Sequence, residues 1–136
     1  LWLWRHVNKK KISFIGYGGN GYQIRDVLHI NDLCMLIYQQ IIKFHKIYNE
    51  RFNVGGGRKS AISLKKLTKI CENLTGNKIM TSSIKKTSTY DIPYYVSSNS
   101  KVTKFYNWRP RKKFLDIAND TYKWLIDNKY NLKKYF

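Results

Sequence analysis

The chain has 136 residues, of which 26 are Lys or Arg and only 8 are Asp or Glu, so its formal net charge is +18. With 43% hydrophobic and 15% aromatic residues, it is too apolar for a disordered segment and large enough for one domain. The charge favours nucleic acid, acidic lipid surfaces or phosphorylated small molecules as partners. However, 20 of the basic residues are Lys, and Asn occurs 12 times. This composition is also typical of a protein whose A+T-rich coding sequence has enriched its surface in Lys and Asn without selection for a polyanionic partner.

The sequence contains no stretch that we predict to be a transmembrane segment or a signal peptide. No apolar stretch approaches the roughly 20 residues that a bilayer requires, and residues 1–7 lack a signal-peptide pattern. Cys34 and Cys71 lie far apart, with no zinc or redox spacing, which indicates a reducing compartment and predicts a cytoplasmic protein. Because the chain opens without Met on what reads as the end of a helix, we expect it to be part of a longer protein.

Strands and helices alternate along the chain, which predicts an α/β or α+β arrangement. Strands are expected over 12–15, 25–30, 51–54, 78–82 and 93–96. Helices are expected over 32–46, 64–75, 98–106 and 114–127. We expect Asn31 and Ser63 to cap two of these helices, Gly76 to follow the end of the second, and Ser98 to be able to cap the third.

Three helices have a predicted apolar face. In the first helix the face consists of Leu33, Leu36, Ile37, Ile41 and Phe44. In the second helix the face consists of Leu64, Leu67, Ile70, Cys71 and Leu74. In the last helix it consists of Ile117, Ala118, Thr121, Trp124 and Leu125. His29 falls within a predicted strand and is interpreted as a structural residue. Residues 129–136 are expected to form a basic, frayed tail.

Three familiar motifs are incomplete. Gly16, Gly18 and Gly21 fit G-x-G-x-x-G, but the following residues favour a strand, whereas a dinucleotide loop must open a helix. Residues 55–60 resemble a phosphate-binding P-loop with the wrong spacing. Tyr130 and Lys134 fit Y-x-x-x-K, but a frayed tail would not hold them in hydrogen-bond geometry. We therefore predict no catalytic, cofactor-binding or metal-binding residue in this chain.

Three other stretches, residues 16–33, 52–67 and 94–110, resemble the C-terminal part of extended short-chain dehydrogenase/reductases in order and spacing. These enzymes are the NAD-dependent nucleotide-sugar epimerases and dehydratases. The I-G-Y-G-G loop, the N-V-G-G-G-R turn and the N-S-K-V-T helix start are most similar to those of the CDP-paratose 2-epimerase (CDP-tyvelose 2-epimerase) group. The resemblance covers most of the chain, about residues 5–128.

This resemblance implies a C-terminal fragment of a Rossmann-type α/β enzyme. Residues 1–128 would comprise the small substrate-binding lobe, plus a strand and a helix that complete the Rossmann sheet. NAD and the catalytic residues would belong mainly to an N-terminal Rossmann portion, so the chain would be inactive alone. The implied partners are a nucleotide-sugar substrate, that N-terminal portion and, for the full enzyme, a second copy in a homodimer, with no membrane and no nucleic acid.

The substrate-binding residues implied by the resemblance are Gln23, Arg25, Tyr95 and Lys86. Arg25 matches an arginine that grips the substrate diphosphate, a task suited to a bidentate guanidinium, although pairing of Arg25 with Asp26 or another acid is the alternative. Gln23 and Tyr95 match positions near the nucleotide. Ser88 stands where relatives have a second phosphate-binding arginine, so Lys85 or Lys86 would have to replace it as a point charge.

Further residues match the resemblance without touching substrate. Asp26 is expected to orient a loop, Asn107 to accept a left-handed backbone, and Trp108 to be a packing residue.

A non-enzymatic, nucleic-acid-binding module is the alternative function. It would use Lys-rich faces formed by Lys101, Lys104, Arg109, Arg111, Lys112 and Lys113. A third hypothesis is an inactive remnant of an enzyme, which the loss of the arginine at Ser88 would suit.

Overall fold

The computed structural model describes residues 1–44 and 49–132. The chain forms two compact units. The first comprises Leu1–Gln23, Ser63–Pro93 and Leu115–Phe136, and the second comprises Ile24–Ile62 and Tyr94–Phe114. Each unit is therefore assembled from segments that are far apart in the sequence.

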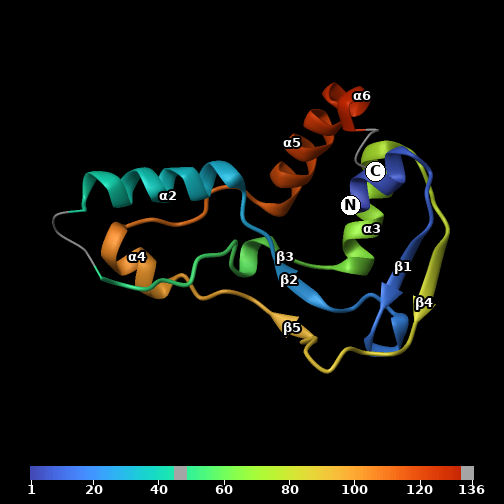
Figure 1. Cartoon of the computed structure of the whole chain (residues 1–136), viewed down its shortest axis with the longest axis horizontal. Helices are drawn as coiled ribbons and strands as arrows, with labels where there is room; N and C mark the ends of the chain where they lie inside the picture. The colour runs from blue at the N-terminus through green and yellow to red at the C-terminus, as the bar shows by residue number, and fades with distance from the viewer. Residues whose placement is uncertain (45–48, 133–136) are drawn as a thin grey trace. The chain divides into compact units, whose positions relative to one another are not determined.

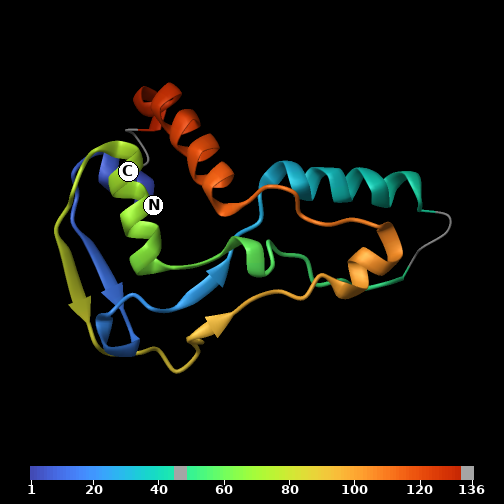
Figure 2. The ribbon, with the colours of Figure 1, turned by 180° about the vertical axis from the view of Figure 1, so that it is seen from behind.

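The first unit combines a two-stranded parallel sheet with helices. Its elements are α1 (Trp2–Val7), β1 (Ile12–Ile15), the short turn η1 (Tyr17–Gly19), α3 (Leu64–Thr75), β4 (Thr81–Ile84), α5 (Phe114–Asp127) and α6 (Lys129–Leu132). Strands β1 and β4 run side by side, with Ile12 opposite Thr81 and Ile15 opposite Ile84 (Figure 1). Helix α1 lies beside α3 in the views from both sides (Figures 1 and 2).

The core of the first unit lies where its helices meet. Leu3, Trp4, Cys71 and Leu125 are buried together. The Trp2 indole Nε1 donates a hydrogen bond to Thr68 Oγ1 at 2.9 Å, which joins α1 to α3. Burial of large apolar side chains contributes roughly 1.5–3 kcal/mol each, so this cluster holds α1, α3 and α5 together.

The second unit is built on a three-stranded sheet with the order β3-β2-β5. Its elements are β2 (Ile24–Asp26), α2 (Ile30–Ile42), the short turn η2 (Arg58–Ser60), β3 (Ala61–Ser63), β5 (Tyr94–Tyr95) and α4 (Ser100–Tyr106). Its core comprises Leu36, Val102, Tyr106 and Trp108. Trp108 is 4% exposed and its Nε1 donates to the Asp32 carbonyl at 3.0 Å, which confirms its packing role. Asn107 has the expected left-handed backbone, with φ of 52°.

The start of α2 differs from the prediction. The helix begins at Ile30, and His29, rather than Asn31, occupies the N-cap position. The Nδ1 atom of His29 accepts a hydrogen bond from the Asn31 N–H at 3.0 Å. A histidine nitrogen satisfies a free N–H of the first turn as a hydroxyl or carboxylate does, which is why the cap was missed among residues expected to form a strand.

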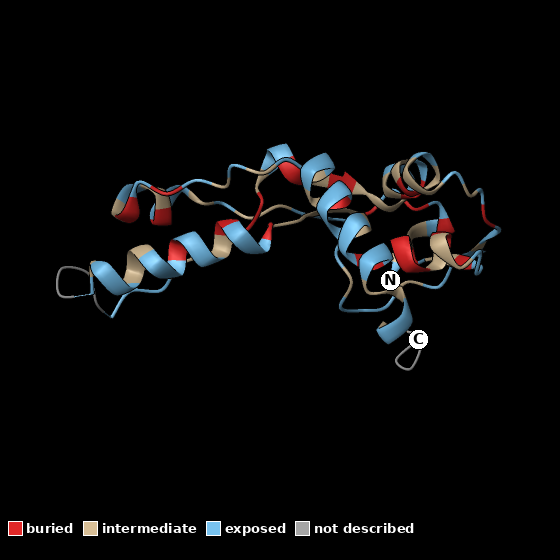
Figure 3. Ribbon diagram, turned by 90° about the horizontal axis from the view of Figure 1, so that it is seen from above, coloured by how far each residue is buried: buried red, intermediate tan, exposed pale blue. Residues whose placement is uncertain are grey.

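Most of the predicted apolar face of α2 is exposed to solvent. Leu36 is buried, but the exposed fraction is 45% for Ile37, 67% for Ile41 and 63% for Phe44, and α2 is largely pale blue in Figure 3. The helix ends at Ile42, and residues 45 and 46 of the predicted helix lie outside the described residues. Helical periodicity identifies an apolar face but does not say whether this chain covers it.

Other predicted elements match with shifts. The strand expected over 78–82 runs over Thr81–Ile84, and that expected over 25–30 runs over Ile24–Asp26. Residues 51–54 form no strand, because within the described ranges they pair with no other strand. Helix α4 begins at Ser100 after Asn99, so Ser98 is not its cap.

The last two helices contain the remaining differences. In α5, Ala118 and Leu125 are buried, but Thr121 and Trp124 are exposed, contrary to the prediction. Residues 129–132 of the expected tail form helix α6, and 133–136 lie outside the described residues. Within the described ranges, no helix has the length and apolar character needed to cross a membrane.

Candidate functional site

The glycine-rich loop 16–21 packs closely on strand β4 of the first unit. The Gly16 N–H donates to the Ile84 carbonyl at 2.8 Å, and Ser83 Oγ donates to the Gly19 carbonyl at 2.8 Å. A Cβ at Gly19 would lie 2.6 Å from the Cβ of Ser83, so glycine is needed there for close approach. The loop leads to β2 and not directly into a helix, unlike a dinucleotide loop.

Gln23 is buried beside this loop, with 7% of its surface exposed. Its Nε2 donates to the Ile15 carbonyl at 2.5 Å and lies 3.4 Å from the Gly16 carbonyl. Its Oε1 is buried and has no hydrogen-bond partner among the described residues. A buried acceptor is unfavourable by about 1–3 kcal/mol unless a donor from water or a ligand meets it.

The segment that contains Lys86 is tied to the same loop. The Tyr17 N–H donates to Thr87 Oγ1 at 2.8 Å, and the Tyr17 hydroxyl donates to the Asp91 carbonyl at 2.5 Å. Lys86, next to Thr87, is exposed. Gln23 and Lys86 therefore both belong to the neighbourhood of the glycine-rich loop in the first unit.

Arg25 and Tyr95 lie in the second unit, where strands β2 and β5 pair in parallel. Arg25 is the direct partner of Tyr95, and Ile24 is the partner of Tyr94. Arg25 is partly buried, and its Nη1 donates to the Ile24 carbonyl at 2.8 Å. Tyr95 is half exposed. The sheet thus brings together two predicted substrate-binding residues that are 70 positions apart in the sequence.

Asp26 orients a loop, as predicted. Its Oδ2 accepts a hydrogen bond from the Gly57 N–H at 2.8 Å, and its Oδ1 accepts one from Ser97 Oγ at 3.4 Å. Asn99 fixes the neighbouring Gly55, since its Oδ1 accepts from the Gly55 N–H at 3.0 Å and its Nδ2 donates to the Gly55 carbonyl at 2.8 Å. These contacts hold the 55–57 turn against the end of β2 and the start of α4.

Asp32 is a structural residue that sequence reasoning missed. It is 6% exposed, and its Oδ2 accepts hydrogen bonds from the N–H groups of Arg111 and Lys112, both at 3.0 Å. The carboxylate thereby fixes the basic segment 109–113. An Asp in the first turn of a helix normally indicates only a favourable interaction with the helix dipole, so the sequence carries no signal of this longer-range contact.

Two of the incomplete motifs can be located in the structure. Residues 55–60 contain the short turn η2 and lead into strand β3, so no helix follows the P-loop-like stretch. Of the Y-x-x-x-K pair, Tyr130 is exposed, and Lys134 lies outside the described residues.

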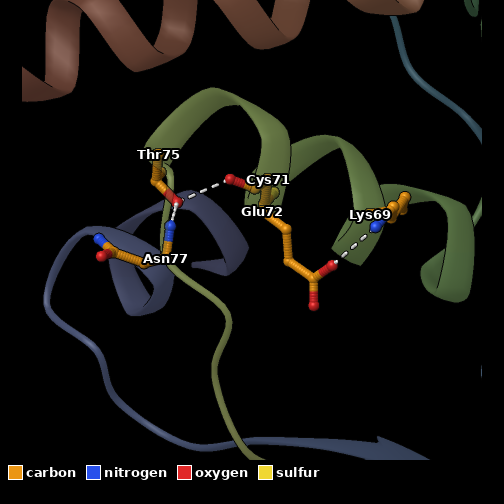
Figure 4. Close-up of polar contacts among 5 residues, drawn as sticks. All are labelled: Lys69, Cys71, Glu72, Thr75 and Asn77. Atoms are coloured by element: carbon orange, nitrogen blue, oxygen red, sulfur yellow. Dashed lines mark hydrogen bonds and ion pairs between the residues drawn. The ribbon is translucent and has the colours of Figure 1, made fainter.

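The two cysteines are free and differ in environment. Cys34 is exposed, whereas Cys71 is 0% exposed within the core of the first unit. Figure 4 shows Cys71 near the end of α3, where its carbonyl accepts a hydrogen bond from Thr75 Oγ1 at 2.8 Å. Burial raises the pKa of the Cys71 thiol from 9.0 to about 11. The thiol is therefore neutral and unreactive near pH 7.

Iodoacetamide is expected to label Cys34 and to spare Cys71 in the folded protein at pH 8, since burial excludes the reagent and suppresses the thiolate. Because the folded pKa is raised, the contribution of Cys71 to stability is complete below pH 9 and is lost as the pH rises to about 11. Peptide mass spectrometry after labelling, with urea-unfolded protein as control, measures both sites. Equal labelling of the two cysteines in the folded protein would contradict this assignment.

The chain was compared with known proteins. No family model matches it. It is 29% identical over 106 residues to CDP-paratose 2-epimerase of Salmonella typhi, an alignment that covers 78% of this chain and 31% of the epimerase. A solved epimerase of Methanothermobacter thermautotrophicus superposes with a TM-score of 0.81 at 18% identity, over 98% of this chain and 38% of that one.

The fold of this chain is similar to that of solved epimerases and dehydratases. Another solved enzyme with this fold is UDP-glucuronic acid 4-epimerase of Bacillus cereus, in complex with UDP-glucuronic acid and NAD, with a TM-score of 0.77 at 18% identity over 93% of this chain and 38% of that one. The chain spans about a third of the length of the curated relatives that it matches. These similarities give no support to a nucleic-acid-binding module.

Proposed function

We propose that this chain is the nucleotide-sugar-binding part of an NAD-dependent epimerase similar to CDP-paratose 2-epimerase, which oxidises and re-reduces a sugar carbon. The observation that carries the proposal is the pairing of Arg25 with Tyr95 across β2 and β5. A planar guanidinium forms two parallel hydrogen bonds to phosphate oxygens, so Arg25 would bind the diphosphate. Tyr95, its strand partner, would contact the nucleotide from the same sheet.

We also propose binding roles for Gln23 and Lys86, which lie in the first unit. The buried Gln23 Oε1 has no partner among the described residues, and it would accept a hydrogen bond from the nucleotide. Lys86 would supply the second positive charge that the family arginine provides at the position of Ser88. Since an ammonium is a compact charge without fork geometry, we expect Lys86 to contribute less than Arg25.

The remaining enzyme would be an N-terminal Rossmann portion that holds NAD. When bound, NAD accepts and returns the hydride of the sugar carbon. The described residues of this chain do not fit the dinucleotide, because the loop 16–21 leads to a strand rather than a helix. The role of this chain would therefore be to bind and orient the substrate. Without the other portion, the chain would catalyse no reaction.

The exposed apolar face of α2 supports the need for such a partner portion. Ile37 and Ile41 are each at least 45% exposed on this helix, and the resemblance places the helix on the Rossmann sheet. The proposal includes a cytoplasmic location, which suits two unpaired cysteines, and residues 1–128 as the substrate-binding portion. A homodimer of the complete enzyme stays a prediction.

Replacing Arg25 by Ala is expected to weaken binding of a nucleotide sugar by about tenfold or more, since a charge-assisted bidentate contact to phosphate is lost. Isothermal titration with CDP-glucose and UDP-glucose measures the dissociation constants. Arg25→Lys should retain part of the affinity, and Arg51→Ala, which removes an exposed arginine, is the matched control. Unchanged affinity in Arg25→Ala, or an equal loss in Arg51→Ala, would refute the role of Arg25.

A further inference from the structure

The second unit contains a cavity of about 840 Å³ that none of the predicted substrate-binding residues lines. Three separate segments form its walls: the turn 56–59, the start of α4 with the residues before it, and the segment 109–113. A volume of this size accommodates a small-molecule ligand, since such sites typically measure about 300–1,000 Å³.

The side chains that line this cavity are strongly basic. Seven of the lining residues carry a positive charge, and no acidic residue lines the cavity. They are Arg58, Lys59, Lys104, Arg109, Arg111, Lys112 and Lys113. Like charges held close together repel one another, and a cleft lined by one sign of charge concentrates counter-ions. The cavity is therefore suited to an anion with several negative charges.

Buried and partly buried groups fix the walls in position. The Asp32 carboxylate binds the N–H groups of Arg111 and Lys112, both at 3.0 Å, and Ser60 Oγ donates to the Lys112 carbonyl at 3.2 Å. Asp26 holds Gly57 on the opposite wall through its N–H group at 2.8 Å. The segments that carry the cationic side chains thus have fixed backbones, which reduces the ordering needed on binding.

Two uncharged polar side chains of the lining form hydrogen bonds to backbone groups of this unit. Asn99 exchanges two hydrogen bonds with Gly55, and Thr103 Oγ1 donates to the Trp108 carbonyl at 2.8 Å. The side chains of Arg58, Arg109 and other cationic residues of the lining are exposed to solvent. Recognition of a ligand would therefore depend on these cations.

The lining also indicates which anion fits. No aromatic side chain lines the cavity, so it offers no platform on which the bases of a single-stranded nucleic acid would stack. Arg109 and Arg111 provide two planar guanidinium groups, which bind phosphoryl oxygens bidentately. We propose that this cavity binds a small molecule with two or more phosphoryl groups, recognised through its phosphates.

The proposal goes beyond the proposed function and stands independently of it. Gln23, Arg25, Tyr95 and Lys86 are absent from the lining of the cavity. The proposal therefore holds or fails whether or not Arg25 binds a nucleotide sugar.

Inorganic pyrophosphate is the probe, titrated calorimetrically into the full chain at an ionic strength of about 0.15 M to screen the general positive field. We expect saturable binding, and in the double variant R109Q/R111Q an affinity lower by about tenfold or more. The control is K66Q/K123Q, which loses the same charge from two exposed lysines of α3 and α5. R25A tests whether pyrophosphate occupies Arg25 instead. Circular dichroism verifies that each variant is folded.

The expected pattern is a large loss in R109Q/R111Q with near wild-type binding in K66Q/K123Q. Equal losses in the two double variants would mean that net charge alone attracts the anion, which overturns the site. Loss confined to R25A would overturn it as well, as would absence of binding to the unmodified chain. Should a single-stranded RNA bind and depend on Arg109 and Arg111 while pyrophosphate does not, the assigned ligand class is wrong.

Discussion

Replacing Gly56 by Ala is expected to lower the free energy of unfolding by about 3 kcal/mol or more. Gly56 is buried, and a Cβ there would collide with the carbonyl oxygen of Val27 and lie 2.7 Å from its carbonyl carbon and 2.8 Å from the Cβ of Ser60. The obstruction is backbone that is itself fixed, because the Val27 N–H donates to the Ser60 carbonyl at 3.3 Å. Side-chain rotation therefore does not relieve the clash.

Gly76→Ala is the matched control for this prediction. Gly76 follows α3 with φ of 67°, and no atom lies within 4 Å of a Cβ built there. The variant should lose only the preference of glycine for a left-handed backbone, roughly 1–2 kcal/mol. Urea unfolding followed by circular dichroism compares the two variants. If Gly56→Ala proves no less stable than Gly76→Ala, the tight packing of the 55–57 turn on Val27 is wrong.

Replacing Asp32 by Ala is expected to destabilise the protein by about 2–4 kcal/mol. The substitution leaves the N–H groups of Arg111 and Lys112 without the acceptor that each has at 3.0 Å, and removes an acidic group from the first turn of α2. Asp32→Asn should lose less, because the amide oxygen still accepts hydrogen bonds. Chemical unfolding of both variants provides the measurement.

Asp127→Ala serves as the reference for loss of one negative charge. Asp127 is exposed in the last turn of α5, where a negative charge is unfavourable, so its removal should change stability by less than about 0.5 kcal/mol. An effect of Asp32→Ala as small as that of Asp127→Ala would show that the carboxylate does not hold the 109–113 segment.

Local signals in the sequence predicted the elements that depend on local chemistry. Helix α5 runs over Phe114–Asp127 as expected, Ser63 caps α3 through a hydrogen bond from the Lys66 N–H at 3.3 Å, and Gly76 ends it. Caps and glycine ends act within one turn, so the residues that determine them are adjacent in the sequence. The residues that follow the glycine-rich loop favoured a strand, and this local signal distinguished it from a dinucleotide loop.

Features that depend on distant residues were not predictable. Nothing near Asp32 indicates that its carboxylate contacts residues 111 and 112. Pairing of Arg25 with Tyr95 follows from sheet topology, which the pattern of single strands does not specify. The resemblance named these two residues as site candidates, and the structure adds their pairing in one sheet.

The central claim, that this chain binds a nucleotide sugar through Arg25 and its strand partner, is tested most directly by nuclear magnetic resonance of the ¹⁵N-labelled chain titrated with CDP-glucose and UDP-glucose. The account predicts saturable shifts of backbone amides that cluster at residues 23–26 and 94–95 and disappear in Arg25→Ala. Saturable shifts that avoid both strands, or an unchanged spectrum at millimolar ligand, would contradict it.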